Sequence, residues 1–499
     1  MAQPLNILLI TTDQQRGDCL GIDGNPVLHT PYLDGLARAE GGAFFSAAYA
    51  EAPACVPQRT AWMLGQHPLT CGQNRWRGRE WKTPETLTGC LAEQGYRVGV
   101  FGKRHFLPVR EPYGAHELKI YESGRHDEDP DDFLLYLRRE TEWGGYSRAH
   151  AIGNNDIFAA ASPLPEQHHP STWTARESAG FLERHAKERP GQPFFLWTSF
   201  NKPHSPYDPP QPYDRMYRPQ DMPGPAWFEK LEDEIGPSQR AARHYTWDTM
   251  GAEQVKVTRA HYYGMISHID LCIGRVLKKL DQYGLRENTV IAFTSDHGDM
   301  LGDHHMYFKG NFFEGASRVP YVWWVPPKRG QELNLKARGR VAAPVGVSTL
   351  GPSLLEAAGA EKPKTFDAGS VLPWLQESRG PAQAEVVTGY GHDKGHTAML
   401  RWERFKYLYW QPGDIRQLFD MQADPGEMNN LALKPEHKAL AAEAHARLER
   451  RLAEYPFGRS EVLDAGGKLR GLPEPTDAFR PRSRGRGGAG IIECGMRIT

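Results

Sequence analysis

Short apolar runs, each followed directly by polar residues, alternate with helical patterns along the N-terminal part of the chain. The runs lie at residues 6–11, 97–101, 193–200 and 289–294, and the longest helical patterns cover residues 172–187 and 253–283. Runs that are apolar on both faces are typical of strands buried in a parallel sheet. Their alternation with helices predicts an α/β fold, with a mostly parallel sheet flanked by helices on both faces.

The residues that follow these runs are capable of chemistry. They are Asp13 and Gln14, Lys103 and His105, His204, and Asp296 and His297. In open α/β sheets, ligands bind outside the carboxyl ends of the strands. Although these residues are far apart in the sequence, the topology gathers them on one edge of the sheet. The sequence therefore predicts a functional site at that edge.

Residues 54–65 place a cysteine at the start of a helix. They follow an expected strand at residues 43–49, and Pro57 with the good helix formers after it predicts the first turns of a helix. Cys55 would then lie at a helix N-terminus, which favours an anion and lowers a thiol pKa. Arg59, one turn further on, is expected to reach back to that anion. The alternative is an ordinary buried cysteine.

The C-terminal part of the chain has a different pattern. Short strands are expected at residues 386–390, 397–401, 405–409 and 417–420, followed by a helix at residues 435–453. This pattern predicts a smaller antiparallel α+β unit. We expect a catalytic domain at residues 1–380, a small C-terminal domain at residues 381–460 and an extended tail at residues 461–499.

The tail and the segment at residues 106–170 lack a regular period. Residues 106–170 are rich in Pro, Gly, Asp, His and aromatic residues, and such long irregular segments are usually functional or mobile. In the tail, residues 490–494 are mostly apolar after an Arg- and Gly-rich stretch. The tail is either an anchor on this subunit or a neighbour, which would give a homo-oligomer, or a disordered end.

Composition excludes several classes of protein. The 499 residues carry a formal net charge of −1, which argues against nucleic-acid and anionic-membrane partners. Six scattered cysteines are too few for a disulfide framework. Neither a targeting segment nor a transmembrane run is visible. We therefore expect a soluble, cytoplasmic protein.

Six short motifs follow one another along the chain. They are Asp13, Cys55-Val56-Pro57-Gln58-Arg59, Gly102-Lys103-Arg104-His105, Lys202-Pro203-His204-Ser205-Pro206, Asp296-His297-Gly298 with Lys309, and Leu418-Phe419-Asp420 through Asn430-Leu431. Taken in order, they resemble the motifs of the sulfatase family, the formylglycine-dependent type I sulfatases of the alkaline phosphatase superfamily. Gln14 departs from the aspartate pair common in sulfatases, and is similar to the choline sulfatase and phosphonate monoester hydrolase branches.

The resemblance implies one divalent cation. Its ligands would be Asp13, Gln14, Asp296 and His297, together with an oxygen of the modified Cys55. Carboxylate and amide oxygens suit calcium, magnesium or manganese, and calcium is expected first. The alternative for Asp296-His297-Gly298 is an ordinary strand-to-turn transition.

The resemblance also implies a set of catalytic residues. Cys55 would be converted to formylglycine by a formylglycine-generating enzyme, and its hydrated aldehyde would be the nucleophile. Arg59, Lys103, His204 and Lys309 would surround the sulfate, with His204 or Lys309 protonating the leaving alcohol. His105 would be the base that releases sulfate, and Asn74 would contact the substrate. The expected substrate is a sulfate monoester of a small alcohol, phenol or saccharide.

Two other functions remain open. One is a phosphonate monoester or phosphodiester hydrolase with the same site, although the resembling phosphonate hydrolases lack the pair formed here by Lys103 and His105. The other is a non-catalytic, sulfatase-like binding protein in which Cys55 stays a thiol. The adjacent histidines at 168–169 and 304–305 lack the spacing of a zinc motif, so we expect them in the substrate pocket or on the surface.

Overall fold

The computed structural model describes residues 4–75, 85–122, 131–143, 147–226, 251–332, 339–392 and 395–473. Within them one large sheet has the strand order β5-β4-β6-β1-β7-β8-β2-β9. These strands are β5 (Glu117–Ile120), β4 (Arg97–Gly102), β6 (Phe194–Pro203), β1 (Asn6–Asp13), β7 (Thr289–Ser295), β8 (Tyr321–Trp324), β2 (Gly42–Phe45) and β9 (Gly339–Val341). Only β8 runs antiparallel to its neighbours. The predicted α/β class is confirmed.

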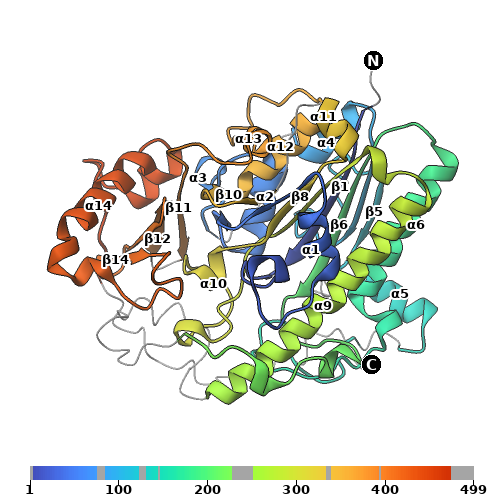
Figure 1. Cartoon of the computed structure of the whole chain (residues 1–499), viewed down its shortest axis with the longest axis horizontal. Coiled ribbons are helices and arrows are strands. Elements are labelled where there is room, and N and C mark those ends of the chain that lie inside the picture. Colours follow the sequence, from blue (N-terminus) through green and yellow to red (C-terminus); the bar gives the residue numbers. More distant parts are fainter. Residues whose placement is uncertain are drawn as a thin grey trace.

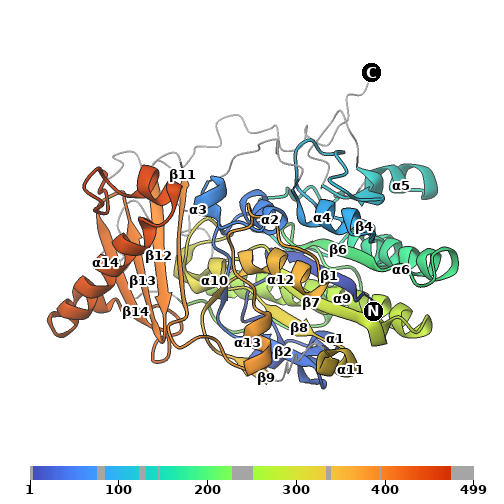
Figure 2. The same cartoon turned by 90° about the horizontal axis from the view of Figure 1, so that it is seen from above.

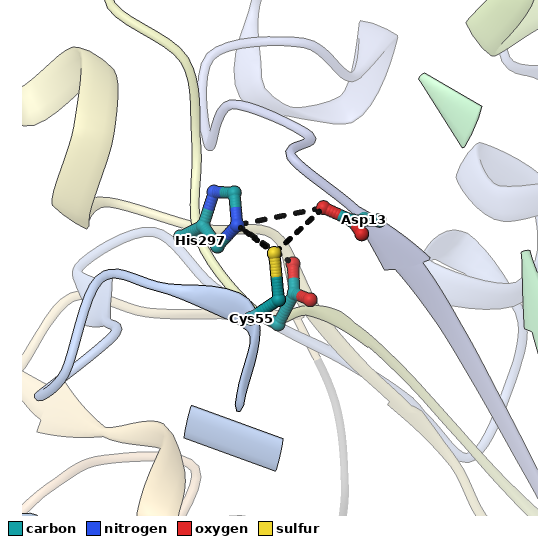
Figure 3. A group of neighbouring side chains, drawn as sticks. Asp13, Cys55 and His297 are labelled. Atoms are coloured by element: carbon teal, nitrogen blue, oxygen red, sulfur yellow. Dashed lines mark hydrogen bonds and ion pairs between the residues drawn. The ribbon is translucent and has the colours of Figure 1, made fainter. Parts of the chain in front are cut away.

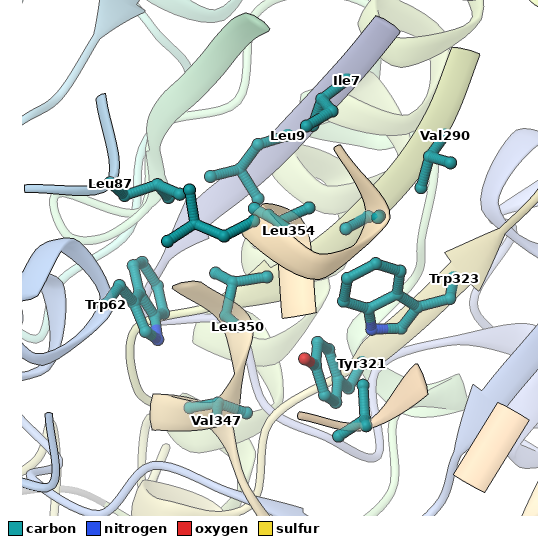
Figure 4. Close-up of a cluster of buried hydrophobic side chains, with 14 of the residues drawn as sticks. Ile7, Leu9, Trp62, Leu87, Val290, Tyr321, Trp323, Val347, Leu350 and Leu354 are labelled. Atoms are coloured by element: carbon teal, nitrogen blue, oxygen red, sulfur yellow. The ribbon is translucent and has the colours of Figure 1, made fainter. Parts of the chain in front are cut away.

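The central strand β1 contributes apolar side chains to two separate cores. Ile7 and Leu9 face one core and Leu8 and Ile10 face the other, as the two-residue period of a strand requires. The first core is covered by α2 (Cys55–Leu64), α4 (Leu87–Glu93), α12 (Leu350–Ala357) and α13 (Leu372–Glu377). Figure 4 shows Trp62, Leu350 and Leu354 packed against the strands of this face.

The second face of the sheet is covered by three helices. They are α1 (Pro31–Arg38), α6 (Pro170–Glu188) and α9 (Ala252–Gln282). Figure 1 shows α6 and α9 lying along this side of the molecule. Helices on both faces leave only the edge at the strand ends for a ligand, as in other doubly covered sheets.

The C-terminal part forms a separate antiparallel sheet. Its strands, in order, are β11 (Glu385–His392), β12 (Gly395–Trp402), β13 (Phe405–Trp410) and β14 (Ile415–Asp420), and α14 (Lys438–Leu452) covers one face. The other face packs on the large unit, where Tyr390 and Trp410 meet Ala54 and Phe313. Figure 2 shows this sheet beside the ends of α2 and α3 (Pro68–Cys71).

The chain continues on the C-terminal sheet after α14. Val462, Leu463 and Leu469 are buried in the core that this sheet forms with α14. The tail was predicted from residue 461, so its first part is packed instead of extended. The expected anchor at residues 490–494 lies outside the described residues. In the described part of the chain no helix has the length and apolar character needed to cross a membrane.

Several elements were not predicted from the sequence. The segment at residues 106–170 contributes the edge strand β5 and the helix α5 (Asp132–Glu140). The expected strand at residues 43–49 is divided into β2 and β3 (Ala48–Tyr49), which pairs with β10 (Val345–Gly346). Two short helices, α10 (Glu314–Ser317) and α11 (Pro327–Glu332), flank β8. Elements this short carry too few residues to show a hydrophobic period.

Candidate active site

Four neighbouring parallel strands end at one edge of the large sheet. The order β4-β6-β1-β7 places Lys103, His204, Asp13 and Asp296 side by side, one at or just beyond the end of each strand. Thr12 pairs with Ser295, so Asp13 and Asp296 follow adjacent positions. The predicted gathering of these residues is therefore present.

Cys55 begins α2 and lies within this group. Its Sγ lies 3.1 Å from Nε2 of His297 and 3.7 Å from Oδ1 of Asp13. Figure 3 shows the three side chains converging from α2, β1 and the segment after β7. Asp296 is in reach as well, because His297 Nε2 lies 3.6 Å from its Oδ1. All four residues are fully buried.

The backbone fixes how His297 presents its ring. Its Nδ1 lies 2.8 Å from the carbonyl oxygen of Gly298, which can only accept a hydrogen bond, so Nδ1 carries a proton. In the neutral ring Nε2 then keeps its lone pair, and that atom faces Cys55 and Asp13. This orientation leaves Nε2 of His297 able to bind a metal ion.

Arg59 is buried, and its guanidinium bonds to Asp296 and to groups at the strand ends. Its Nε donates to Asp296 Oδ2 at 2.6 Å, and its Nη1 donates to the Lys103 carbonyl at 2.8 Å and to Ser199 Oγ at 2.9 Å. The side chain has no exposed surface. Its donors hold Asp296 and the loop after β4, and no hydrogen bond to Cys55 is found among the described residues, so the contact of this guanidinium with an anion at residue 55 stays a prediction.

Gln14 is held in one orientation by its neighbours. Its Nε2 donates to Asp299 Oδ2 at 2.7 Å, so its amide oxygen must face the other way. That oxygen accepts from Lys309 Nζ at 2.6 Å. The backbone N–H of Gln14 donates to Asp296 Oδ1 at 3.1 Å. Asp299 therefore fixes the Gln14 amide so that its uncharged oxygen faces Lys309.

Two lysines complete the inner group. Lys103 Nζ forms a buried ion pair with Asp13, and Lys309 Nζ lies 2.8 Å from His204 Nε2. Burial and Asp13 raise the pKa of the Cys55 thiol, but Lys103, Lys309 and His297 outweigh them and lower it below its ordinary value. The expected lowering of this pKa is confirmed, and its main sources are neighbouring cations.

His105 follows β4, and Asn74 follows α3. The backbone N–H of His105 donates to Glu122 Oε1 at 2.7 Å, and the residue has a positive φ of 63°. Asn74 contacts the C-terminal sheet, since its backbone oxygen accepts from Gly391 N at 2.8 Å. Neither residue is among the four whose donor atoms cluster around Cys55.

The donor atoms fit a divalent cation. One ligand atom each from Asp13, Cys55, Asp296 and His297 lies within 4.8 Å of the others. Two buried carboxylates and the imidazole nitrogen of His297, together with the amide oxygen of Gln14 that accepts from Lys309, form a mixed set dominated by oxygen. Oxygen-rich sets of this kind suit calcium, magnesium or manganese.

The adjacent histidines at 168–169 and 304–305 are not among the four residues whose donor atoms cluster at the candidate cation site. His304 is buried and stacked on Phe313, and His169 caps α6 by accepting from Ser171 N. The expectation of a pocket or surface position is therefore wrong for His169. His304, by contrast, lines a cavity together with Arg16, Arg259 and Asp303.

A second group with metal-ligand chemistry is already satisfied by protein contacts. Glu166, His268 and Cys272 present ligand atoms within 4.8 Å of one another. Glu166 Oε1, however, accepts from Arg275 Nη1 at 2.7 Å and from Thr172 Oγ1 at 2.8 Å. These donors compensate the carboxylate, so the group forms a hydrogen-bond network.

Comparison with known proteins agrees with this geometry. A family model described as Sulfatase matches residues 5–360, and one described as the C-terminal part of N-sulphoglucosamine sulphohydrolase matches residues 302–454. An arylsulfatase of Clostridium perfringens is 32% identical over 492 residues, covering 94% of this chain and 98% of its own. A choline-sulfatase of Rhizobium meliloti is 28% identical over 478 residues, covering 92% and 88%.

The fold is also found among solved structures. A phosphonate monoester hydrolase of Agrobacterium radiobacter superposes with a TM-score of 0.72 at 24% identity, covering 90% of this chain and 96% of its own. With the family model matching most of the chain, the assignment is clear. The protein belongs to the sulfatase family of hydrolases.

Proposed function

We propose that this protein hydrolyses sulfate monoesters, using a formylglycine formed from Cys55 and one bound calcium ion. The observation that carries the proposal is the position of Cys55 Sγ, 3.1 Å from His297 Nε2 and 3.7 Å from Asp13 Oδ1, in a buried group that also holds two lysines. A thiol kept only for packing requires no such surroundings.

The proposed cation is held by Asp13, Gln14, Asp296 and His297, together with an oxygen on residue 55. When bound, it would polarise the attacking oxygen and the sulfate oxygens. Calcium is favoured because the protein supplies mainly oxygen ligands, one of them uncharged. The orientation of Gln14 by Asp299 supports this assignment.

Charge at the site supports a monoanionic ester. A divalent cation balances the charges of Asp13 and Asp296, so the charges of Arg59, Lys103 and Lys309 are in excess, and the guanidinium of Arg59 is directed to Asp296 and the backbone. Lys103 and Lys309 remain to attract the substrate. A sulfate monoester carries one negative charge, whereas a phosphate monoester carries two near neutral pH.

The protein's own residues supply the proton transfers. We assign the protonation of the leaving alkoxide or phenoxide to Lys309, whose Nζ lies 2.8 Å from His204 Nε2. His105, on the loop after β4, is assigned the role of base that releases sulfate. Lys103 keeps Asp13 ionised, since its charge lowers the pKa of that carboxyl well below the usual range against the opposing effect of burial.

A phosphonate monoester or phosphodiester hydrolase is the second candidate. Gln14 favours it, because this residue removes one negative charge from the cation site and is shared with the phosphonate branch that the sequence resembles. A silent binding protein would require Cys55 to remain a thiol.

The mass of the peptide that contains Cys55 tests the nucleophile. Conversion of Cys55 to formylglycine removes two electrons at Cβ, replaces sulfur by oxygen and releases sulfide. A formylglycine-generating enzyme with its oxidant must carry out this oxidation. Protein produced together with that enzyme is expected to carry the aldehyde. The Cys55→Ala variant is expected to fold but not to hydrolyse the substrate. Full sulfatase activity from a protein with an unmodified thiol would contradict the proposal.

A further inference from the structure

The backbone turn after β4 carries Lys103 and His105, and its first residue is fixed by the large sheet. The N–H of Lys103 donates to the Ser199 carbonyl at 2.9 Å, and its carbonyl accepts from Arg59 Nη1 at 2.8 Å. The Nζ of Lys103 forms a buried ion pair with Asp13. The turn is thereby joined to the candidate cation site through Lys103.

The next two residues of the turn share one acceptor. The N–H groups of Arg104 and His105 both donate to Oε1 of Glu122, at 3.0 Å and 2.7 Å. Consecutive N–H groups that converge in this way form a small anion-binding concavity. His105 has a φ of 63°, a conformation that residues other than glycine adopt rarely and that the surrounding structure must hold. The carboxylate of Glu122 holds it here.

Glu122 is itself anchored by the irregular segment that follows the turn. It comes after the edge strand β5, where the N–H of Tyr121 donates to the Gly102 carbonyl at 3.1 Å. The N–H of Glu122 donates to Asp131 Oδ2 at 3.1 Å, and Asp131 Oδ1 caps α5 by accepting from Leu134 N at 2.8 Å. Glu122 is only 3% exposed. The segment therefore brings a fixed, buried carboxylate to the turn.

We infer that Glu122 is a positioning residue, which holds the backbone turn that carries His105 by accepting from both N–H groups. The inference rests on the proposed function and deepens it, because His105 is assigned the release of sulfate. Glu122 acts through the backbone of residues 104 and 105, and no catalytic role is assigned to its carboxylate. Part of the irregular segment at residues 106–170 thereby serves the reaction.

The two steps of the proposed reaction can be measured separately. The phenol leaves when the sulfuryl group passes to one oxygen of the hydrated aldehyde at residue 55. Sulfate leaves when a base takes the proton from the other oxygen, so that a C=O bond forms as the C–O bond to sulfate breaks. Because Lys103 has supports of its own, loss of Glu122 is expected to slow the second step more than the first.

Glu122→Met, which has a similar length and no strong acceptor, separates the two steps. With 4-nitrophenyl sulfate it is expected to release nitrophenol in a fast burst and then to turn over about 10- to 100-fold more slowly than the wild type, as for a misplaced catalytic group. During the slow phase, the peptide that contains residue 55 is expected to carry an additional SO₃ group in mass spectrometry.

Two further variants serve as controls. Glu122→Gln is expected to retain most of the wild-type rate, because its amide oxygen still accepts both N–H groups. Glu117→Met, on β5, removes another carboxylate of the same segment. Glu117 pairs with Arg97 and Arg184 and forms no hydrogen bond to the turn among the described residues, so this variant is expected to leave both steps unchanged.

Hydrogen exchange reads the turn without any substrate. The amide hydrogens of Arg104 and His105 are expected to exchange slowly in the wild type, because both are bonded to a buried carboxylate. A peptide that spans the turn is expected to exchange faster in Glu122→Met, while peptides from β1 and β7 stay unchanged. If Glu122→Met does not fold, Glu122→Asp, which withdraws the carboxylate by one methylene, takes its place in both measurements.

The outcomes separate this inference from the proposed function. Unchanged exchange in the turn of the folded variant, as judged by circular dichroism, would overturn the inference, and so would equal slowing of nitrophenol release and sulfate release. Glu122→Gln as slow as Glu122→Met would also overturn it. If the wild type cleaves no sulfate ester, the sulfatase proposal fails, whereas the exchange measurement still decides whether Glu122 holds the turn.

Discussion

Lys309 Nζ lies 2.8 Å from Nε2 of His204, and this contact assigns a proton to each side chain. An ammonium group can only donate, so His204 Nε2 accepts. Its other nitrogen, Nδ1, lies 2.8 Å from the carbonyl of Ser205 and must carry the ring proton. Lys309 is therefore the group with a proton to give.

Replacement of Lys309 should lower kcat most for esters with poor leaving groups. Lys309→Met is expected to lower kcat about 10²–10⁴-fold for an alkyl sulfate, the range for a lost general acid, and far less for 4-nitrophenyl sulfate, whose phenoxide needs no proton. The measurement is the slope of log kcat/KM against leaving-group pKa. An unchanged slope would show that Lys309 does not act as the acid.

Arg59 should contribute to the stability of the folded protein as well as hold Asp296 in the site. Arg59→Met leaves Asp296 buried without its cation, which is expected to cost about 3–5 kcal/mol in the free energy of unfolding. Urea titration measures this loss. Arg38→Met is the control, because Arg38 is largely exposed and its pair with Asp34 spans 3.8 Å, so it should cost about 0–1 kcal/mol. Equal losses would refute the account of Arg59.

Asp299 should control metal affinity through Gln14. Its two carboxylate oxygens accept from Gln14 Nε2, Tyr207 OH and two backbone N–H groups. Asp299→Asn cannot accept all four, so the amide of Gln14 is free to turn. Calcium affinity measured by calorimetry is expected to fall about 10–100-fold, as for other supports of metal ligands. Tyr207→Phe, which leaves the carboxylate intact, should weaken binding less.

Asp270 should make stability depend on pH. It accepts the N–H groups of Tyr32 and Leu33 at the start of α1, and burial raises its pKa from 3.8 to about 7. The folded state then holds a proton that the unfolded state releases near pH 4. Its contribution to stability is complete below pH 4 and is lost as pH rises to about 7, by up to a few kcal/mol.

Asp270→Asn removes this titration. Urea unfolding at pH 5 and pH 8 is expected to show a larger decrease in the free energy of unfolding for the wild type than for the variant. Parallel changes in both proteins would mean that Asp270 has an ordinary pKa in the folded state.

The sequence could predict the large sheet and the residues at its edge because those features follow from local patterns. Buried parallel strands are continuous apolar runs, and Asp13, Lys103, His204 and Asp296 come directly after four of them. The antiparallel strand β8 and the short edge strand β5 have no comparable period, since four residues are too few to show one.

The supports of the site were not predictable from one sequence. Asp299 comes directly after the Asp296-His297-Gly298 motif, and nothing in the local sequence indicates that it holds Gln14 in place. Glu122 follows the edge strand β5, and only the pairing of that strand with β4 brings it to the turn that carries His105. Such pairs arise from tertiary contact, which leaves no signal in local spacing.

We propose that the site prefers a sulfate monoester, and a comparison of three esters of one leaving group measures this preference. kcat/KM is measured with nitrophenol as the leaving group, carried as sulfate, as phenylphosphonate and as phosphate, on protein whose residue 55 has been shown to be formylglycine. The phosphate is expected to be turned over poorly, because it is a dianion near neutral pH. The sulfate is expected to be turned over faster than the phosphonate, which is a monoanion of equal charge, because the resembling phosphonate hydrolases lack the pair formed here by Lys103 and His105. A phosphonate faster than the sulfate by more than about tenfold, or roughly 1.4 kcal/mol of transition-state preference, would contradict the account.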